Sequence, residues 1–289
     1  MTFKLSLREL EVFVAVADHG TVTEAASKVA LTQSAASQAL QMLQQGLGVT
    51  LFDRVGRRLQ LNEHGRLLLP RARAMLASAQ EMQNLVNDEA IHLRLGASTT
   101  IANYLLPARL AAFRQRYRQS RVQLQVGNTQ AIVDAVATFQ VDMGLIEGSC
   151  HHAEIVVTPW QEDELVVVVA GQWAAAQGDG PLGLASLVGM PWIVRETGSG
   201  TREVVEQQLF PVLGSVDVAM ELGDLEAIKH TVAAGLGVSC LSRHVVADLL
   251  ANGKLAEVRQ DASQLRRPLF CIRHRDKAVT RGMDVMTAI

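Results

Sequence analysis

Cysteine is scarce in this chain of 289 residues, with three widely separated residues at Cys150, Cys240 and Cys271. They form no C-x-x-C pair, which argues against a disulfide framework or a zinc site of that type. No apolar run approaches the roughly 20 residues that cross a bilayer, and no apolar segment typical of a secretory signal peptide is present. We therefore expect a reduced, soluble, cytoplasmic protein with no membrane partner.

Aromatic residues and net positive charge are also in short supply. Aromatics make up 4% of the chain and the formal net charge is −2, while 48% of the residues are apolar. This balance is typical of bacterial α/β proteins, and the length allows two or more units with cores of their own. The charge excludes an overall basic nucleic-acid-binding surface, so any basic character must be local. Several arginines do gather in one stretch: Arg54, Arg57, Arg58, Arg66, Arg71 and Arg73.

Residues 7–61 have the pattern of a winged helix-turn-helix. A first helix is predicted by apolar residues that share one helical face, namely Leu10, Val12, Phe13, Val16 and Ala17. Gly20 is expected to end it. Thr21 and Glu24 have the spacing of a capping box at the start of a second helix. Thr32 then begins a third helix after only three residues, which is the tight connection that a helix-turn-helix needs.

The third predicted helix has an uncharged polar face. Its inner face is predicted by the apolar residues Ala36, Ala39, Leu40 and Leu43. Its outer face carries amides and hydroxyls: Gln33, Ser34, Ser37, Gln38, Gln41 and Gln45. Amides can read adenine in the major groove, and hydroxyls can hold phosphates. The alternative is a neutral surface helix in some other small helical domain.

A β-hairpin is predicted next, between residues 51–54 and 59–61. Its turn contains Gly56, and Arg54, Arg57 and Arg58 surround that turn. Arginines on such a wing suit the phosphate backbone of DNA. Replacement of Arg57 should therefore weaken binding to all DNA alike, whereas Gln38→Ala should lower sequence preference.

A long helix is predicted from Asn62, which can cap it, to about Asn87. Its apolar residues form a heptad-like stripe: Leu68, Ala72, Met75, Ala79, Met82 and Val86. Pro70 lies in the early turns, where it removes one backbone donor and is expected to kink the helix. We expect the stripe to be covered by a second copy of the chain, although packing on its own C-terminal domain is the alternative.

From Ile91 onward short apolar strands alternate with helices, which predicts an α/β domain with mainly parallel sheets. There are too many units for one small sheet, so two lobes are expected. The predicted organisation is residues 1–61, 62–90 and 91–289, with lobe I at about 91–161 and 267–289 and lobe II at about 162–266. Residues 165–170 are fully apolar, as a buried parallel strand would be.

Short polar residues follow the predicted strands at four places: Ser98-Thr99-Thr100, Asn128-Thr129, Gly198-Ser199-Gly200-Thr201 and Gly223-Asp224. In α/β sheets ligands bind beyond the carboxyl ends of strands, near helix N-termini. Any one group is more simply a helix cap, but together they indicate a cleft for a small anion. Arg195, Arg202 and Lys229 would add positive charge.

The chain resembles the LysR-type transcriptional regulators. The resemblance is carried by LTQSAASQALQMLQQGLGVTLFDRVGRRLQLNEHGRLLLPRA at 31–72, and by NYLLP at 103–107, GLIEG at 144–148, RETGSGTRE at 195–203 and EAIKH at 226–230. The later motifs look like those of a subgroup with YeiE-like members. The family implies a winged helix-turn-helix, a linker helix and a two-lobed, periplasmic-binding-protein-like α/β effector domain.

The resemblance also implies partners and site residues. The partners would be promoter DNA, a second copy in homodimers that pair into homotetramers, and RNA polymerase. The residues expected on DNA are Thr32, Gln33, Ser34, Ser37, Gln38, Gln41, Arg54, Arg57 and Arg58. The residues expected around the ligand are Ser98, Thr99, Thr100, Asn128, Thr129, Glu147, Arg195, Ser199, Gly200, Thr201, Asp224 and Lys229.

No cofactor is expected apart from a small-molecule co-inducer. The subgroup implies a small oxyanion, with sulfite a candidate. One position departs from the pattern, because Asp224-Leu225 stands where Asn-Ser is expected before EAIKH. Asp224 either caps the next helix or faces the cleft, where it would repel a bare anion.

Two other classes share parts of this plan. A solute-binding protein of the transport class has two such lobes, but residues 1–61 argue against it. An enzyme with a DNA-binding head would turn its ligand over, yet Gly198-Ser199-Gly200 lacks the G-x-S-x-G spacing and no catalytic triad stands out. Cys150-His151-His152 cannot all close on one metal, so neither a metal site nor catalysis is expected.

Overall fold

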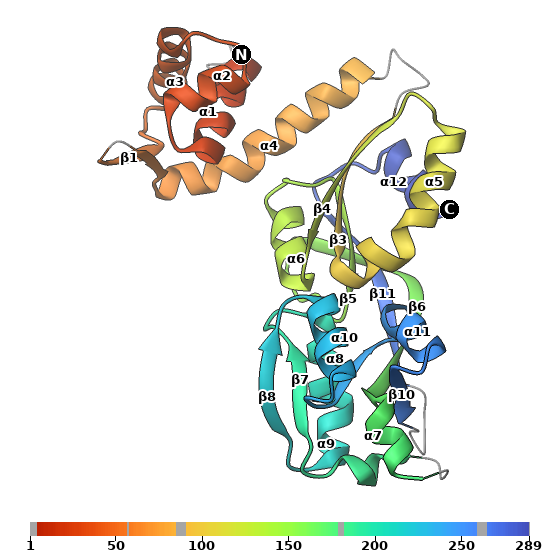
Figure 1. Ribbon diagram of the computed structural model, residues 1–289. Helices are drawn as coiled ribbons and strands as arrows, with labels where there is room; N and C mark the ends of the chain where they lie inside the picture. The colour runs from red at the N-terminus through yellow and green to blue at the C-terminus, as the bar shows by residue number, and fades with distance from the viewer. Residues whose placement is uncertain (1–4, 57, 85–90, 179–181, 259–264, 289) are drawn as a thin grey trace. The chain divides into compact units, whose positions relative to one another are not determined.

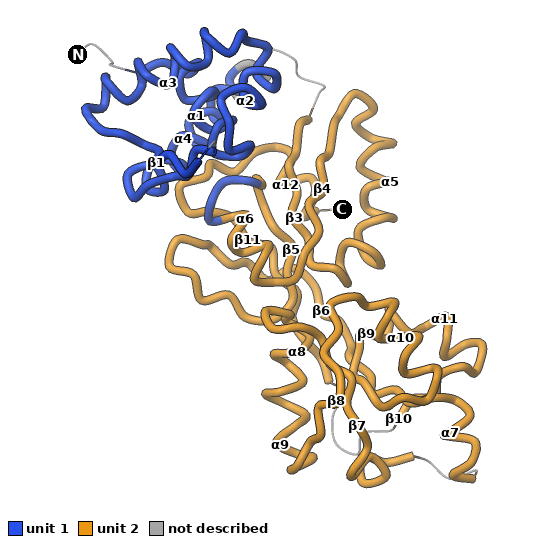
Figure 2. Tube along the Cα trace, turned by 60° about the vertical axis from the view of Figure 1, so that its left-hand side comes forward, with its two compact units in different colours: residues 1–90, 137–140 blue, residues 91–136, 141–289 orange. Residues whose placement is uncertain are grey.

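The computed structural model describes residues 5–56, 58–84, 91–178, 182–258 and 265–288 (Figure 1). The chain divides into two compact units (Figure 2). Unit 1 comprises residues 1–90 with the short segment 137–140, and unit 2 comprises 91–136 and 141–289. Within the described ranges, no helix is long and apolar enough to cross a membrane.

Unit 1 is a three-helix core followed by a hairpin and a long helix. Its elements are α1 (Leu7–His19), α2 (Val22–Lys28), α3 (Gln33–Leu47), β1 (Phe52–Val55), β2 (Arg58–Leu61) and α4 (Glu63–Asn84). Gly20 ends α1 with a φ of 75°, as predicted. Thr21 Oγ1 accepts a hydrogen bond from the backbone N–H of Glu24, which is half of the predicted capping box. The full reciprocal box lies one helix earlier, between Ser6 and Glu9.

The three short helices share one hydrophobic core. Leu10, Phe13 and Val16 of α1 are buried there with the small residues of α2 and with Leu40 and Leu43 of α3. Ala25 and Ala26 let α1 and α3 approach α2 closely, because they present little more than a methyl group. The alanine-rich second helix therefore explains the tight crossing that positions α3.

The predicted stripe of α4 divides into two parts. Ala72 is buried in the core of unit 1, and Leu68, Leu69 and Leu76 are half-buried and pack against it. Met75 and Met82 remain 47% and 64% exposed. The expectation that a second copy covers the stripe was therefore wrong for its N-terminal half, because α4 starts directly beside the core of unit 1. Val86 and residues 85–87 lie outside the described part of the chain.

Unit 2 contains a sheet of seven described strands in the order β10-β6-β11-β5-β3-β4, with β9 also paired to β6, and a two-stranded sheet β7-β8. The first part comprises β3 (His92–Ser98), η1 (Ile101–Leu105), α5 (Leu106–Arg116), β4 (Arg121–Gly127), α6 (Thr129–Ala137), β5 (Met143–Glu147) and β6 (Ile155–Ala170). The middle comprises α7 (Gly171–Ala176), η2 (Leu184–Leu187), β7 (Pro191–Arg195), α8 (Gly200–Val204), η3 (Val205–Leu209), α9 (Phe210–Leu213) and β8 (Asp217–Leu222). The last part comprises α10 (Leu225–Ala233), β9 (Ser239–Ser242), α11 (Arg243–Ala251), β10 (Leu255–Val258), β11 (Leu265–His274) and α12 (Arg281–Ala288).

The strands β6 and β11 run antiparallel through unit 2 and join its two lobes (Figure 1). Lobe I has its cores around β3 and β5, and lobe II has its cores around the second half of β6 and β7. Gln161 pairs with Leu269 and Asp163 with Arg267, so the two predicted crossings lie side by side. The strand predicted at 165–170 is the second part of the longer strand β6.

The prediction of mainly parallel sheets was wrong for much of unit 2. β3 is parallel to β4 and β5, and β7 is parallel to β8, but β6 pairs antiparallel with β9, β10 and β11. The apolar run at 165–170 has another cause. Its alternate side chains enter two different cores, for example Val167 on one face and Val166 on the other. Burial on both faces produces such a run whatever the strand direction.

Candidate functional site

The outer side of α3 carries an exposed polar face, which consists of Gln33, Ser34, Ser37, Gln38 and Gln41. Thr32 caps the helix, and its Oγ1 accepts a hydrogen bond from the backbone N–H of Ala35 at 3.2 Å. The opposite side of α3 is buried in the core of unit 1. The α3 polar face therefore presents amides and hydroxyls to solvent from a rigid helix.

The position of α3 is fixed at its far end by side-chain and backbone contacts. Gly48 ends the helix with a φ of 72°. Gln44 Oε1 accepts a hydrogen bond of 2.7 Å from the backbone N–H of Leu51, which leads into the hairpin. Glutamines of the same helix thus have two different roles, since Gln44 is half-buried and holds the chain together whereas Gln38 is exposed.

The hairpin β1-β2 forms the wing that was expected. Val55 pairs with Arg58, and Arg54 pairs with Leu59. The backbone N–H of Leu59 donates to Gly20 O at 2.8 Å, which ties the wing to the end of α1. Arg54 and Arg58 are exposed, whereas Arg57 lies outside the described residues.

In unit 2, three parallel strands end together. Ser98 pairs with Gly127 and Ala97 pairs with Leu145, so the residues after β3, β4 and β5 meet at one edge. This brings together Ser98, Thr99, Thr100, Asn128, Thr129 and Glu147, as the sequence predicted.

The glycine turn at 198–201 packs against these strand ends from lobe II. The backbone N–H of Gly200 donates to Thr129 Oγ1 at 3.3 Å, and Thr129 Oγ1 donates to Glu147 O at 2.7 Å. A Cβ added at Gly200 would lie 1.9 Å from Glu147 O, so no side chain fits there. We call the assembled group the strand-end cluster, and it consists of Ser98, Thr99, Thr100, Asn128, Thr129, Arg195, Ser199, Gly200 and Thr201.

Some members of the strand-end cluster are already hydrogen-bonded within the protein. Thr99 Oγ1 donates to Gly127 O at 3.1 Å. Asn128 Oδ1 accepts from the backbone N–H of Ala131 at 2.9 Å and so caps α6. Thr201 Oγ1 accepts from Arg267 Nη1 at 2.7 Å. These side chains hold the cluster in shape.

Four other members are buried, and each has one polar atom with no hydrogen-bond partner among the described residues. Their polar atoms are Ser98 Oγ, Thr100 Oγ1, Ser199 Oγ and Arg195 Nη1. The exposed fractions of these residues are 0%, 1%, 4% and 3%. A buried polar group without a partner destabilises a protein by about 1–3 kcal/mol. We call these four atoms the unpaired donors.

The cations near the cluster differ in how many carboxylates they face. Arg202 pairs with Glu206 at 2.7 Å and with Glu221. Lys229 Nζ lies 2.9 Å from Glu226 and 3.3 Å from Asp248, so its ammonium is paired away from the unpaired donors. Arg195 instead faces one carboxylate, that of Glu196, at 2.7 and 2.8 Å.

Arg267 is a central residue that the sequence reading missed. It is fully buried and donates from Nε and Nη2 to Asp163 Oδ2 at 2.9 and 2.6 Å. Its Nη2 also lies 2.6 Å from Glu147 Oε2, and Ser242 donates to Asp163 at 2.8 Å. Glu147 was expected at the ligand, but the structure commits its carboxylate to Arg267. The sequence signal was weak, since Asp163 and Arg267 stand beside other charged residues of the crossing strands, namely Glu162, Glu164 and Arg266.

Asp224 is exposed and caps α10. Its Oδ1 accepts a hydrogen bond of 2.8 Å from the backbone N–H of Ala227. Of the two alternatives open from the sequence, the capping one is observed.

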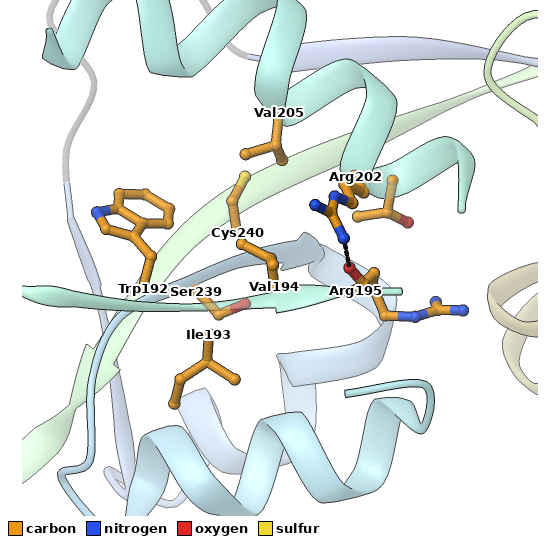
Figure 3. Close-up of a pocket in the computed structure, with 9 residues that line it drawn as sticks. Trp192, Ile193, Val194, Arg195, Arg202, Val205, Ser239 and Cys240 are labelled. Carbon is orange, nitrogen blue, oxygen red and sulfur yellow. Dashed lines mark hydrogen bonds between the residues drawn. The ribbon is translucent and has the colours of Figure 1, made fainter. Parts of the chain in front are cut away.

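A small cavity lies beside the cluster in lobe II, lined by Trp192, Val205 and Cys240 among others (Figure 3). Arg195 is among the lining residues, but its guanidinium points away from the other lining side chains (Figure 3). Burial raises the pKa of Cys240 to about 12 and that of Cys271 to about 11, so both thiols stay protonated at neutral pH. Within the described ranges, no group of three or more His, Cys, Asp or Glu residues is arranged to hold a metal ion.

The chain matches two family descriptions along most of its length. Residues 7–66 match the bacterial regulatory helix-turn-helix protein of the lysR family, and residues 87–288 match the LysR substrate binding domain. The HTH-type transcriptional regulator YeiE of Escherichia coli is 50% identical over 279 residues, covering 96% of this chain and 94% of its own. The transcriptional activator CmpR of Synechocystis is 32% identical, covering 95% and 91%.

Solved structures share the fold. Full-length OxyR from Pseudomonas aeruginosa superposes with a TM-score of 0.80 at 23% identity, covering 98% of this chain and 94% of its own. CbnR complexed with its target DNA has a TM-score of 0.68 at 22% identity, covering 98% of each chain. The Synechocystis CcmR regulatory domain in complex with 2-PG has a TM-score of 0.61 at 28% identity, covering 68% and 96%. The predicted fold class is confirmed.

Proposed function

This chain belongs to the LysR family of transcriptional regulators, and we propose that its α3 polar face reads promoter DNA while its strand-end cluster binds a small oxyanion. The family and the relatives named above are regulators rather than enzymes, which agrees with the prediction of no catalysis. Such a regulator acts in the bacterial cytoplasm, where its DNA lies.

The DNA-reading role rests on exposure and chemistry. Gln33, Gln38 and Gln41 present amides that can make paired hydrogen bonds with adenine, and Ser34 and Ser37 can contact phosphate. Thr32 begins this surface, and Arg54, Arg57 and Arg58 of the wing would hold the flanking backbone.

The wing can be tested by the salt dependence of DNA binding. Arg58→Ala should lower the affinity for specific and random duplexes by the same factor. It should also reduce the steepness of log affinity against log salt by about one, since one phosphate contact is lost. Fluorescence anisotropy across a salt series measures both. Arg116→Ala, an exposed arginine of α5 with the same charge change, should leave the slope unchanged. A slope that does not move in the Arg58 variant would contradict the wing's role.

The oxyanion role rests on one observation, the four unpaired donors in a buried cluster. Three hydroxyls and a guanidinium can all donate, and an oxyanion supplies several acceptor oxygens at once. Hydrogen bonds to a charged acceptor are worth about 1.5–3 kcal/mol each, which exceeds the typical value for neutral pairs. Sulfite is the first ion to test, because the YeiE-like resemblance implies it.

The ligand can be identified by titration calorimetry of the full chain. The panel comprises sulfite, sulfate, phosphate and small carboxylates. Ser199→Ala should lower the affinity for whichever ion binds about tenfold, the equivalent of roughly 1.4 kcal/mol. The free energy of unfolding should stay unchanged or rise, because an unpaired buried hydroxyl is removed. Ser186→Ala, in η2, is the matched control and should not alter binding. If no ion of the panel gave a binding heat, the oxyanion proposal would be wrong.

We further propose that the chain forms homodimers that pair into tetramers and that RNA polymerase is a partner on the promoter. The exposed Met75 and Met82 of α4 support a partner helix there. Two copies would place two α3 helices on successive half-sites. Met82→Glu should reduce the mass measured by sedimentation, whereas Val188→Glu, 75% exposed in lobe II, should not.

A further inference from the structure

A partly exposed carboxylate covers the buried Arg195. Arg195 Nε donates to Glu196 Oε2 at 2.7 Å, and Nη2 donates to Oε1 at 2.8 Å. The Arg195 side chain is 2% exposed and that of Glu196 is 25% exposed. Glu196 therefore reaches from the solvent side onto one edge of the guanidinium and leaves Nη1 unpaired.

Glu196 is held in this place by several contacts. Asn128 donates to the backbone carbonyl of the neighbouring Thr197 at 3.4 Å and lowers the pKa of the Glu196 carboxylate, and the backbone carbonyl of Glu196 accepts from Ser199 N–H at 3.2 Å. Partial burial raises the pKa of Glu196, but the hydrogen bonds and charge of Arg195 outweigh it, so the pKa lies below its ordinary value. The carboxylate is therefore ionised at neutral pH, and it lies against Arg195 at the edge of the strand-end cluster.

The neighbouring cations show what is different about Arg195. Each of the other three faces two carboxylates: Arg202 with Glu206 and Glu221, Lys229 with Glu226 and Asp248, and Arg267 with Glu147 and Asp163. Arg195 faces Glu196 alone and keeps a buried nitrogen without an acceptor. One further negative charge would complete the pattern seen at the other three.

A doubly charged ion would exceed that pattern of two negative charges for each cation by one charge. Glu196 already neutralises Arg195, and the carboxylate of Glu147 lies one strand end away on Arg267. Charges about 4 Å apart in a partly buried site interact by about 4 kcal/mol at an effective dielectric constant near 20, so one surplus charge lowers affinity by up to about a thousandfold. Hydrogen bonding alone would not distinguish a singly charged oxyanion from a doubly charged one of similar shape.

We propose that Glu196 selects the effector by its charge, so that the strand-end cluster accepts a singly charged oxyanion and rejects a doubly charged one of similar shape. This inference rests on the oxyanion proposal above and adds to it the charge of the ligand. Arg195 Nη1 and the hydroxyls of Ser98, Thr100 and Ser199 bind the oxygens, and Glu196 sets how much negative charge they can hold.

The test compares two ions with similar oxygens and different charge. Methanesulfonate is singly charged and sulfate is doubly charged at neutral pH, and both are titrated calorimetrically into the full chain at constant ionic strength. The wild type should favour methanesulfonate. Glu196→Gln should raise the affinity for sulfate at least about tenfold relative to methanesulfonate, because the competing charge is removed. Glu196→Asp keeps the charge and should keep the wild-type preference.

The matched control is Glu221→Gln, which removes a carboxylate from Arg202 instead and should change the ratio of the two affinities by less than about threefold. Thermal melts confirm that each variant is folded. A ratio that is unchanged in Glu196→Gln overturns the charge selection while oxyanion binding stands. Sulfate binding that is gained only in Glu196→Gln supports it. No binding of any probe to the wild type and to Glu196→Gln overturns the oxyanion proposal itself, and the charge selection with it.

Discussion

The α3 polar face and the strand-end cluster are made of similar side chains, namely amides, hydroxyls and arginine close by, yet they differ in burial. The residues of the α3 polar face are exposed, so water satisfies them when no partner is bound. The unpaired donors of unit 2 are buried and have no such substitute. The α3 polar face suits a large partner such as DNA. The unpaired donors suit a small ion, because its oxygens would supply the hydrogen bonds that these buried atoms lack.

The arginines of the wing and the cations near the strand-end cluster also differ in how many carboxylates surround them. No acidic group lies within 4 Å of Arg54 or Arg58 among the described residues, whereas each cation near the cluster faces one or two carboxylates. The net charge of −2 is summed over the whole chain and so averages these opposite arrangements. A near-neutral total therefore says little about what either region binds.

The largest effect is expected where charges are fully buried. Arg267→Met should destabilise the protein by about 3–5 kcal/mol, because Glu147 and Asp163 would keep their charges without a partner. Arg266→Met, one residue away on the exposed side of β11, should cost less than about 1 kcal/mol. Chemical denaturation of both variants measures the difference. Equal losses would show that the buried network is not a determinant of unit 2 stability.

A smaller effect separates two glutamines of α3. Gln38→Ala should lower the preference for the specific site over a random duplex by about 1–3 kcal/mol and leave unfolding unchanged. Gln44→Ala should leave the preference for the specific site unchanged. It should lower the free energy of unfolding by about 1 kcal/mol, because the hydrogen bond to Leu51 is removed. Competition binding and thermal melts on both variants test this. If Gln38→Ala weakened specific and random DNA equally, the readout role would be wrong.

The smallest effect separates adjacent threonines after β3. Thr99→Val should destabilise by about 1 kcal/mol, because Thr99 donates to Gly127, and should leave ion binding intact. Thr100→Val should weaken ion binding and not destabilise, since its hydroxyl has no partner in the described residues. Melts with and without the bound ion distinguish the two. A stability loss confined to Thr100→Val would reverse the assignment of these side chains.

Much of unit 1 could be predicted because its determinants are local. Gly20 ends α1, Thr32 caps α3, and the inner residues of both helices recur at a spacing that any helix imposes. At the cluster, the rule that parallel strands end at one edge sufficed to group Ser98 with Thr129. That rule places residues at an edge but does not say which of their hydroxyls are already hydrogen-bonded.

The remaining features depend on contacts between distant parts of the chain. Arg267 and Asp163 are 104 residues apart, and their ion pair exists only because β6 and β11 lie antiparallel in one register. The burial that leaves Arg195 Nη1 unpaired likewise requires the packing around the end of β7. The amino-acid sequence by itself determined the helix-turn-helix, the wing and the polar residues at the strand ends, because spacing and capping act over a few residues. Tertiary structure alone decided the pairing of charges and the burial of donors. Both depend on which side chains, far apart in the sequence, pack together and exclude water.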